Sequence, residues 1–184
     1  MLLRLTLLLT LCGLPFLTSA HNLIPGQPLP PVGVTDRGEL IVQQDKIRYQ
    51  RWNTDRLAGK TGIVLHMAGR LAAKESNAAL IQAIENAGFP GTTVQIVTIV
   101  NTDDAVPGSA IFVRQSLESS KKETPGAQFV VDATGAVRRS WQLVEGGSAV
   151  VILGKQGRIR FAHDGALTDE QVRQVIALVQ QLRV

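Results

Sequence analysis

Two apolar runs separated by a helical pattern form the most regular part of the sequence. Residues 63–67 read Ile-Val-Leu-His-Met between Gly62 and Gly69, which is typical of a central strand covered on both faces. Residues 71–87 are alanine-rich with apolar positions at helical spacing, and residues 93–100 are rich in β-branched side chains. This order predicts a β-α-β unit with two parallel strands.

The second half of the chain alternates helical and extended patterns. A helix is expected over residues 109–122, with Phe112, Val113 and Leu117 as its buried stripe. Extended segments on either side of the turn sequences D-A-T-G and G-K-Q-G are expected at residues 129–131 and 137–143, and at residues 149–153 and 158–161.

The last helical pattern covers residues 168–182. Thr168 is placed to be its N-cap, and Gln171 follows three residues later, as in a capping box. A parallel strand pair followed by a helix, a hairpin and a final helix predicts an α/β protein. We expect a three-layer α/β/α sandwich with a mixed central sheet.

Less regular patterns precede the first strand. Residues 21–31 contain four prolines and are expected to run extended over the surface. Residues 32–42 have apolar arms around Asp36-Arg37-Gly38 and predict a hairpin with its turn at Gly38. Residues 49–57 show no clear period and are assigned to a loop or a short helix.

The first twenty residues have the pattern of a secretory signal peptide. Arg4 is the basic residue of its start, a short apolar run follows, and small residues allow cleavage after Ala20. We therefore expect residues 21–184 to be the mature chain, exported and folded as one domain that is not held in a membrane. Cys12 is the only cysteine, so this mature chain contains no thiol.

The charge of the chain gives no sign of a nucleic-acid-binding protein. The net charge of +4 falls to +3 when Arg4 is removed, and the basic residues are dispersed. Aromatic residues are also few, so the basic stripe of a nucleic-acid-binding protein is absent from the sequence and no nucleic-acid partner is expected.

Two levels of resemblance can be assigned. The element order, together with L-A-G-K-T-G-I-V-L at residues 57–65, resembles the thioredoxin-like superfamily, in particular its exported members and the peroxiredoxins. A closer resemblance is to the YtfJ family, through the segments at residues 30–40, 66–75, 98–109, 116–122 and 163–168. The latter resemblance implies a periplasmic, thioredoxin-like protein without an established activity.

Both parts of the superfamily's redox site, the cysteines and the proline that faces them, are missing from the sequence. Thioredoxin-type chemistry needs a thiolate at the start of the first helix, where the helix lowers the thiol pKa. Residues 68–74 occupy that place and contain no cysteine. The superfamily also has a proline facing the cysteines, and the corresponding position near Ser148 is not proline. Disulfide exchange and cysteine peroxidase activity are therefore excluded.

Polar residues nevertheless gather where two parallel strands are predicted to end. The carboxyl ends of such strands, together with a helix N-terminus, commonly bind ligands and anions. The candidate binding residues are His66, Arg70, Asn101, Thr102, Asp103, Asp104 and Ser148. They could equally be structural caps of the strand ends, since any α/β fold needs polar groups there.

Two functional readings remain open. In the first, the chain is a binding or adaptor protein that uses the former active-site surface to hold a peptide, a small anion or a protein partner. In the second, it is a non-redox enzyme in which His66 acts as a base with Asp103 or Asp104, and Ser109 or Ser148 supplies a hydroxyl. No cofactor is expected, and His21 as a free N-terminus is a weak candidate for copper binding.

Overall fold

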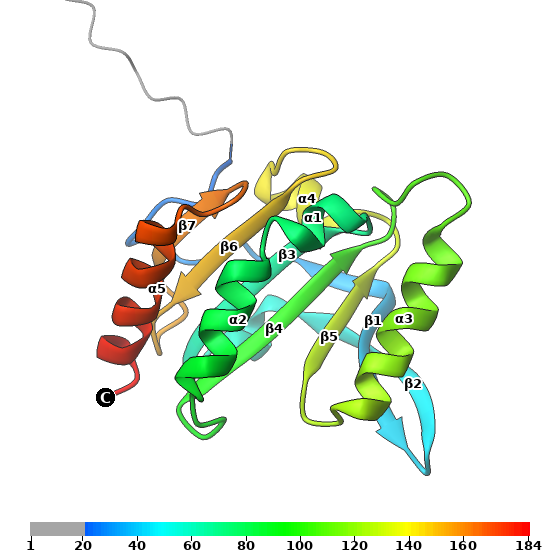
Figure 1. Ribbon diagram of the computed structural model, residues 1–184, viewed down its shortest axis with the longest axis horizontal. Helices are drawn as coiled ribbons and strands as arrows, with labels where there is room; N and C mark the ends of the chain where they lie inside the picture. The colour runs from blue at the N-terminus through cyan, green and yellow to red at the C-terminus, as the bar shows by residue number, and fades with distance from the viewer. Residues whose placement is uncertain (1–20) are drawn as a thin grey trace, which may run out of the picture.

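A computed structural model describes residues 21–184 of the chain. The predicted signal peptide, residues 1–20, lies outside the described residues. Seven strands form one sheet in the order β2-β1-β5-β4-β3-β6-β7 (Figure 1).

Three parallel strands form the centre of the sheet. β3 (Thr61–Ala68) pairs along its whole length with β4 (Val94–Asn101), and β4 pairs with β5 (Gln128–Asp132). Every residue of β3 is buried, as expected for a strand covered on both faces. The predicted parallel β-α-β unit is confirmed.

Two antiparallel hairpins complete the sheet. β1 (Gly33–Gln43) pairs with β2 (Lys46–Asn53), and β1 also joins the centre through β5. On the other side, β6 (Ser148–Leu153) pairs with both β3 and β7 (Ile159–Asp164). The sheet is therefore mixed, and the hairpin predicted around G-K-Q-G is confirmed.

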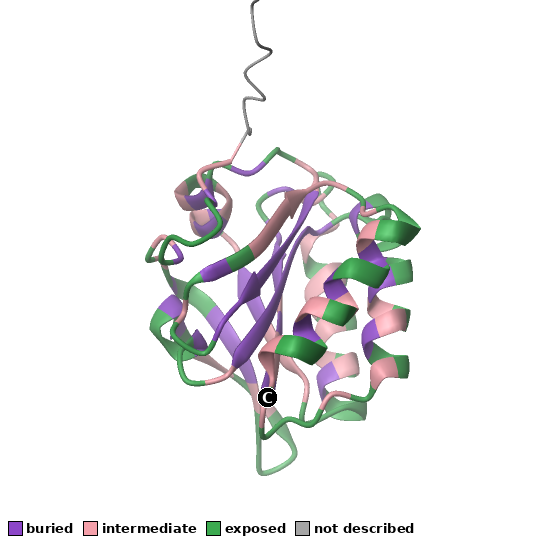
Figure 2. Ribbon diagram, turned by 90° about the vertical axis from the view of Figure 1, so that its left-hand side faces the viewer, coloured by how far each residue is buried: buried purple, intermediate pink, exposed green. Residues whose placement is uncertain are grey.

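Helices lie on both faces of the sheet (Figures 1 and 2). One face carries four of them: α1 (Leu71–Glu75), α2 (Ala78–Ala87), α3 (Ala110–Glu123) and α5 (Asp169–Leu182). The other face carries α4 (Ala136–Trp141), a 3₁₀ turn (Thr54–Leu57) and the N-terminal segment. The predicted capping box of the last helix is present, with Thr168 and Gln171 in the expected roles.

The apolar core is divided by the sheet into two clusters. Ile63 and Leu65 pack with Leu80 of α2, whereas Val64 packs with Trp141 of α4. Successive side chains of β3 thus alternate between the two helical layers. Figure 2 shows how strongly the buried residues concentrate on the strands.

The N-terminal segment is attached to the face that carries α4. Leu23 and Leu29 are buried in its core cluster, and Pro28 forms an isolated bridge with Arg158. The indole Nε1 of Trp141 donates a hydrogen bond to the carbonyl of Pro30 at 3.0 Å.

The hairpin predicted around Gly38 turns elsewhere. β1 runs on to Gln43, and the turn is formed by Gln44 and Asp45, which both have positive φ. Gly38 lies instead beside a register shift in the β1–β2 pairing, where a Cβ atom would stand 2.0 Å from the carbonyl oxygen of Gln50. Gly38 therefore belongs to a β-bulge and not to a turn. Most of the segment assigned to a loop or short helix, up to Asn53, is strand β2.

The helix predicted over residues 71–87 is broken into α1 and α2. Ser76 and Asn77 lie at the break, and their side chains donate hydrogen bonds to the carbonyls of Ala72 and Ala73. Such local side-chain bonds compete with helical backbone hydrogen bonds, which explains the interruption.

Residues 137–143 were expected to be extended, but most of them belong to helix α4. The carboxylate of Asp132 accepts hydrogen bonds from the backbone amides of Thr134, Ala136 and Val137. These amides would otherwise be unsatisfied at the start of a helix, so this carboxylate makes the helical turn favourable.

Candidate functional site

The ends of the two predicted parallel strands, β3 and β4, lie side by side at one edge of the sheet, next to the start of β6. Ala68 pairs with Asn101, and Met67 pairs with Ser148. Directly paired residues project to the same face, and neighbours along a strand alternate. Ser148 therefore shares the face of Met67, whereas His66 projects to the opposite face, and the sheet divides the predicted cluster in two.

His66 is held in the layer below α4. Its side chain is only 2% exposed, and its Nε2 atom has no hydrogen-bond partner. Burial lowers the pKa of His66 to about 4, and the positive charge of Arg138 lowers it further while Asp104 opposes both effects. The imidazole is therefore neutral at pH 7.

Asp104 and Arg138 form an ion pair next to this histidine. The Nε of Arg138 lies 3.3 Å from Oδ2 of Asp104, although the contact lacks hydrogen-bond geometry. The same carboxylate oxygen accepts a hydrogen bond from the backbone amide of Gly146 at 3.2 Å. Asp104 thus ties α4 to the loop before β6, which is a structural role.

Asn101, Thr102 and Asp103 shape the loop after β4. Oδ1 of Asn101 accepts a hydrogen bond from the amide of Asp103, and its Nδ2 has no partner. The amide of Thr102 donates to the carbonyl of Asp132 at 2.9 Å. Asp103 is exposed, with its carboxylate 4.0 Å from Nη2 of Arg138. Sequence reasoning did not single out Arg138 or Asp132, which complete this network from a neighbouring segment.

Arg70 lies at the surface at the start of α1. Its Nε donates a hydrogen bond to the backbone carbonyl of Asp104, not to a carboxylate. The guanidinium covers Gly146, where a Cβ atom would meet Nη1 of Arg70 at 3.2 Å. The expected anion site at this helix start has little support, because α1 contains only five residues.

The catalytic alternative is not favoured by this arrangement. It requires His66 in an open cleft, whereas the ring is buried. Ser148 projects to the other face of the sheet, and its buried Oγ has no hydrogen-bond partner. The hydroxyl of Ser109 is bonded to the carbonyl of Val106 at 2.7 Å.

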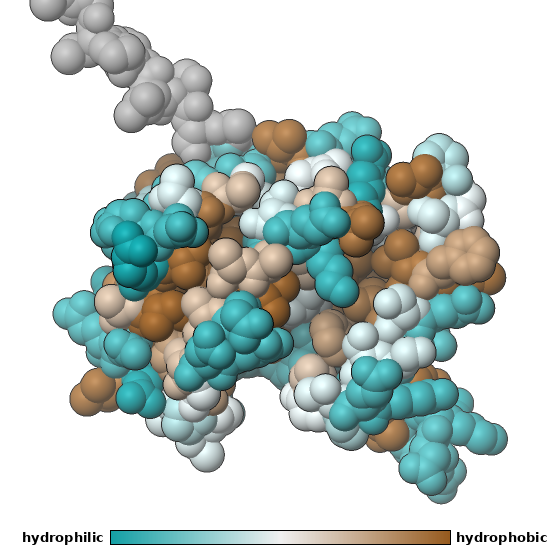
Figure 3. All heavy atoms as spheres, in the orientation of Figure 1, coloured by the Kyte–Doolittle hydropathy of each residue, from teal (hydrophilic) through white to brown (hydrophobic). Residues whose placement is uncertain are grey.

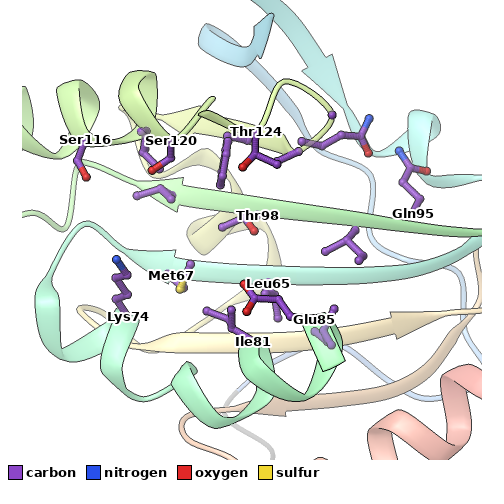
Figure 4. A pocket seen from close by; sticks show the side chains of 18 of the residues that line it. Leu65, Met67, Lys74, Ile81, Glu85, Gln95, Thr98, Ser116, Ser120 and Thr124 are labelled. Atoms are coloured by element: carbon purple, nitrogen blue, oxygen red, sulfur yellow. The ribbon is translucent and has the colours of Figure 1, made fainter. Parts of the chain in front are cut away.

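The face opposite His66 carries a large groove that sequence reasoning missed. It has a volume of about 1190 Å³ and lies between α2 and α3, over the central strands. Figure 3 shows this side of the molecule, and Figure 4 shows side chains from both helices and from β3 and β4 around the same space. Leu65, Met67, Ile96, Thr98 and Val100 form its floor.

α3 explains why the groove stays open. Phe112, which was expected to be buried, is 68% exposed at the groove. Below it, Ser116, Ser120 and Thr124 follow one another at four-residue spacing along the groove wall. Small hydroxyl side chains at these positions leave space above β4 that larger apolar residues would fill.

One end of the groove reaches the start of the first helix. Ala68, Gly69, Arg70, Leu71 and Lys74 line this end. They include the start of the first helix, where redox members of the fold class need a thiolate. The groove thus connects the start of the first helix with the space between α2 and α3.

Within residues 21–184, no three His, Cys, Asp or Glu side chains are grouped so that they could hold a metal ion. None of the helices described has both the length and the apolar character needed to cross a membrane.

The mixed sheet and its helical layers define a thioredoxin-like α/β protein. A Bacteroides thetaiotaomicron protein assigned as a disulfide isomerase matches with a TM-score of 0.62 and 12% identity, over 88% of this chain and 91% of that one. The reduced 2-Cys peroxiredoxin of Plasmodium vivax matches with a TM-score of 0.54 and 11% identity, over 85% and 82%. At these identities the likeness establishes the fold alone.

Within this class the chain belongs to the YtfJ_HI0045 family, which is described as a bacterial protein of unknown function and matches residues 23–182. YtfJ of Escherichia coli K12 is 53% identical over 182 residues, covering 99% of both chains. A Haemophilus influenzae protein is 39% identical over 178 residues, covering 96% of this chain and 97% of its own. The predicted family is confirmed.

Proposed function

We propose that this protein is a non-redox binding protein of the periplasm, and that its ligand site is the groove between α2 and α3. One observation carries the proposal: the groove opens at residues 68–74, the position where redox members of the fold class need a thiolate. The fold keeps a surface at this place although residues 21–184 contain no thiol that could react there.

The chemistry of the groove suits binding better than catalysis. Its floor is largely apolar, with Leu65, Met67 and Val100 contributed by adjacent strands. Ligand sites are typically concave and mostly apolar, with a few polar groups that orient the ligand. Ser116, Ser120 and Lys74 are polar groups of this kind at its margin. The buried imidazole of His66 lies on the other face of the sheet and takes no part.

The proposed periplasmic location rests on the predicted signal peptide and on cleavage after Ala20. An exported chain without cysteine needs no redox partner to fold, and its stability must come from packing. A binding role in that compartment is compatible with both properties.

A photocrosslinking amino acid placed in the living cell tests the binding role. At Ser116 it would face the groove, whereas at Ser119 it would lie on the same helix, exposed and outside the groove. We expect specific adducts from position 116 and none from position 119. Equal labelling at both positions, or no adduct at either, would contradict the proposal.

A further inference from the structure

Among the described residues that line the groove, one cation is free to meet a ligand; an acidic side chain, Glu85 of α2, also lines the groove, away from Lys74 in Figure 4. Of its lining cations, Arg56 pairs with Glu39, and Lys60 donates to the carbonyl of Gly91. Arg70 is engaged with the carbonyl of Asp104. Among the described residues, the ammonium of Lys74 has neither a hydrogen bond nor an ion pair, and Figure 4 shows its side chain at one end of the groove.

The floor beyond Lys74 is long and apolar. The stretch of β4 from Val94 to Val100 is about 20 Å long at roughly 3.3 Å per residue. One leaflet of a bilayer, half of its hydrocarbon core, is about 15 Å thick, so an acyl tail of membrane length fits along this floor. The groove volume of about 1190 Å³ leaves room for such a tail.

A peptide fits these features less well. From Val97 to Asn101 both edges of β4 are already paired, with β3 and with β5, so an added strand would find no free backbone groups along that part of the floor. A helix that docks in a groove does so through its apolar face, so it would make no use of the free cation at one end of this groove. A ligand with one anionic head and one long apolar tail matches that distribution of charge.

We propose that the groove binds a long-chain fatty acid, with its carboxylate at Lys74 and its tail along β4 between α2 and α3. This inference rests on the proposed binding function and names the class of ligand. The partly exposed side chains of Ile96 and Thr98 would be covered by the tail. Phe112, now largely exposed at the groove, would gain an apolar neighbour.

The test uses purified residues 21–184 and palmitate, kept below its critical micelle concentration, as a competitor of fluorescent cis-parinarate. We expect saturable displacement at one site. Laurate, four methylenes shorter, should bind at least tenfold and at most about two hundredfold more weakly, the upper limit corresponding to full burial of each methylene. Absence of saturable displacement would overturn the proposal.

Two matched pairs of variants locate the head and the tail. Lys74→Glu should weaken palmitate binding by about fivefold or more and leave 1-hexadecanol binding unchanged. Lys122→Glu, which alters another exposed lysine in the last turn of a helix, should change neither. Ser120→Trp should fill the groove and abolish displacement, whereas Ser119→Trp should not. Palmitate binding that is insensitive to Lys74→Glu or to Ser120→Trp contradicts the assigned pose.

Thermal unfolding of every variant shows whether it is folded. The mass of the adducts crosslinked at Ser116 separates this inference from the broader function. A fatty-acid mass supports both proposals. A protein or peptide mass, together with no palmitate binding, overturns the fatty-acid proposal and leaves the binding function standing, whereas no adduct and no binding overturn both.

Discussion

The Nε atom of Arg138 lies 3.3 Å from the Oδ2 atom of Asp104, and this carboxylate is only 4% exposed. The pair links α4 to the loop that follows β4, on the face of the sheet that carries His66. A buried carboxylate that loses its cation is costly, because neither water nor another charge compensates it.

The first prediction concerns this ion pair. Arg138→Met should lower the free energy of unfolding by about 2 kcal/mol, below the range for fully buried pairs because Arg138 is 20% exposed. Chemical denaturation measures the change. Arg173→Met removes an exposed ion pair with Glu170 and should have no measurable effect. Equal effects of the two substitutions would show that Asp104 does not depend on Arg138.

The second prediction concerns pH and His66. Its pKa is lowered from 6.5 to about 4, chiefly by burial, so the unfolded chain binds a proton more readily than the folded chain between these values. Its contribution to stability is fully present above pH 6.5, falls as the pH decreases toward 4, and amounts to roughly 3 kcal/mol.

Denaturant unfolding between pH 4 and pH 7 measures this dependence. His66→Gln should reduce the slope of the free energy of unfolding against pH in that window. The reduction should correspond to at most one proton taken up on unfolding. His163→Gln, which removes a partly exposed histidine of β7, is the matched control. An unchanged slope in His66→Gln would mean that His66 is not buried in its neutral form.

The third prediction concerns the start of α4. Asp132 is fully buried, and its Oδ2 accepts a hydrogen bond from the amide of Val137 at 2.8 Å. Asp132→Ala leaves this amide and that of Ala136 without a partner and should destabilise the protein by about 2–3 kcal/mol. Asp132→Asn, which keeps one carbonyl acceptor, should cost less.

Hydrogen exchange at residues 134–141 checks the structural cause. Asp132→Ala should speed exchange in α4 selectively. Asp36→Ala removes one exposed hydrogen bond to the amide of Ala133 and provides the control. Exchange that rises equally throughout the sheet would argue against a local capping role for Asp132.

The fourth prediction concerns processing and redox behaviour. The protein isolated from the periplasmic fraction should have the mass of residues 21–184, because cleavage after Ala20 removes Cys12. Its melting temperature should be the same with and without a reductant, and maleimide should not label it. A labelled protein, or one that retains residues 1–20, would contradict the predicted cleavage.

The central strands could be predicted because their signals are local and strong. The apolar run at residues 63–67 strongly favours a buried strand. The pattern over residues 168–182, with Thr168 as N-cap, specifies a helix. The family could be assigned because its segments extend through nearly the whole chain. The same patterns brought His66, Asn101 and Ser148 to one edge of the sheet.

Other elements depended on specific contacts, one with a residue distant in sequence and one with a residue only a few positions away. Gly38 is a turn signal by itself, and only its close approach to Gln50 makes it a bulge. Residues 137–143 have β-branched and aromatic members, but the carboxylate of Asp132 satisfies the amides of a helical turn there. Local propensity was overridden in both places by a specific tertiary or capping contact.

The sequence by itself determined the fold class, the family and the lack of any thiol in residues 21–184. Tertiary structure decided which face each polar residue occupies, because a strand alternates its side chains and the sheet then separates neighbours such as His66 and Met67. It also decided that α3 stands apart from α2 with Phe112 exposed, leaving a groove. The distance between two helices depends on how whole layers pack, and no local pattern encodes it.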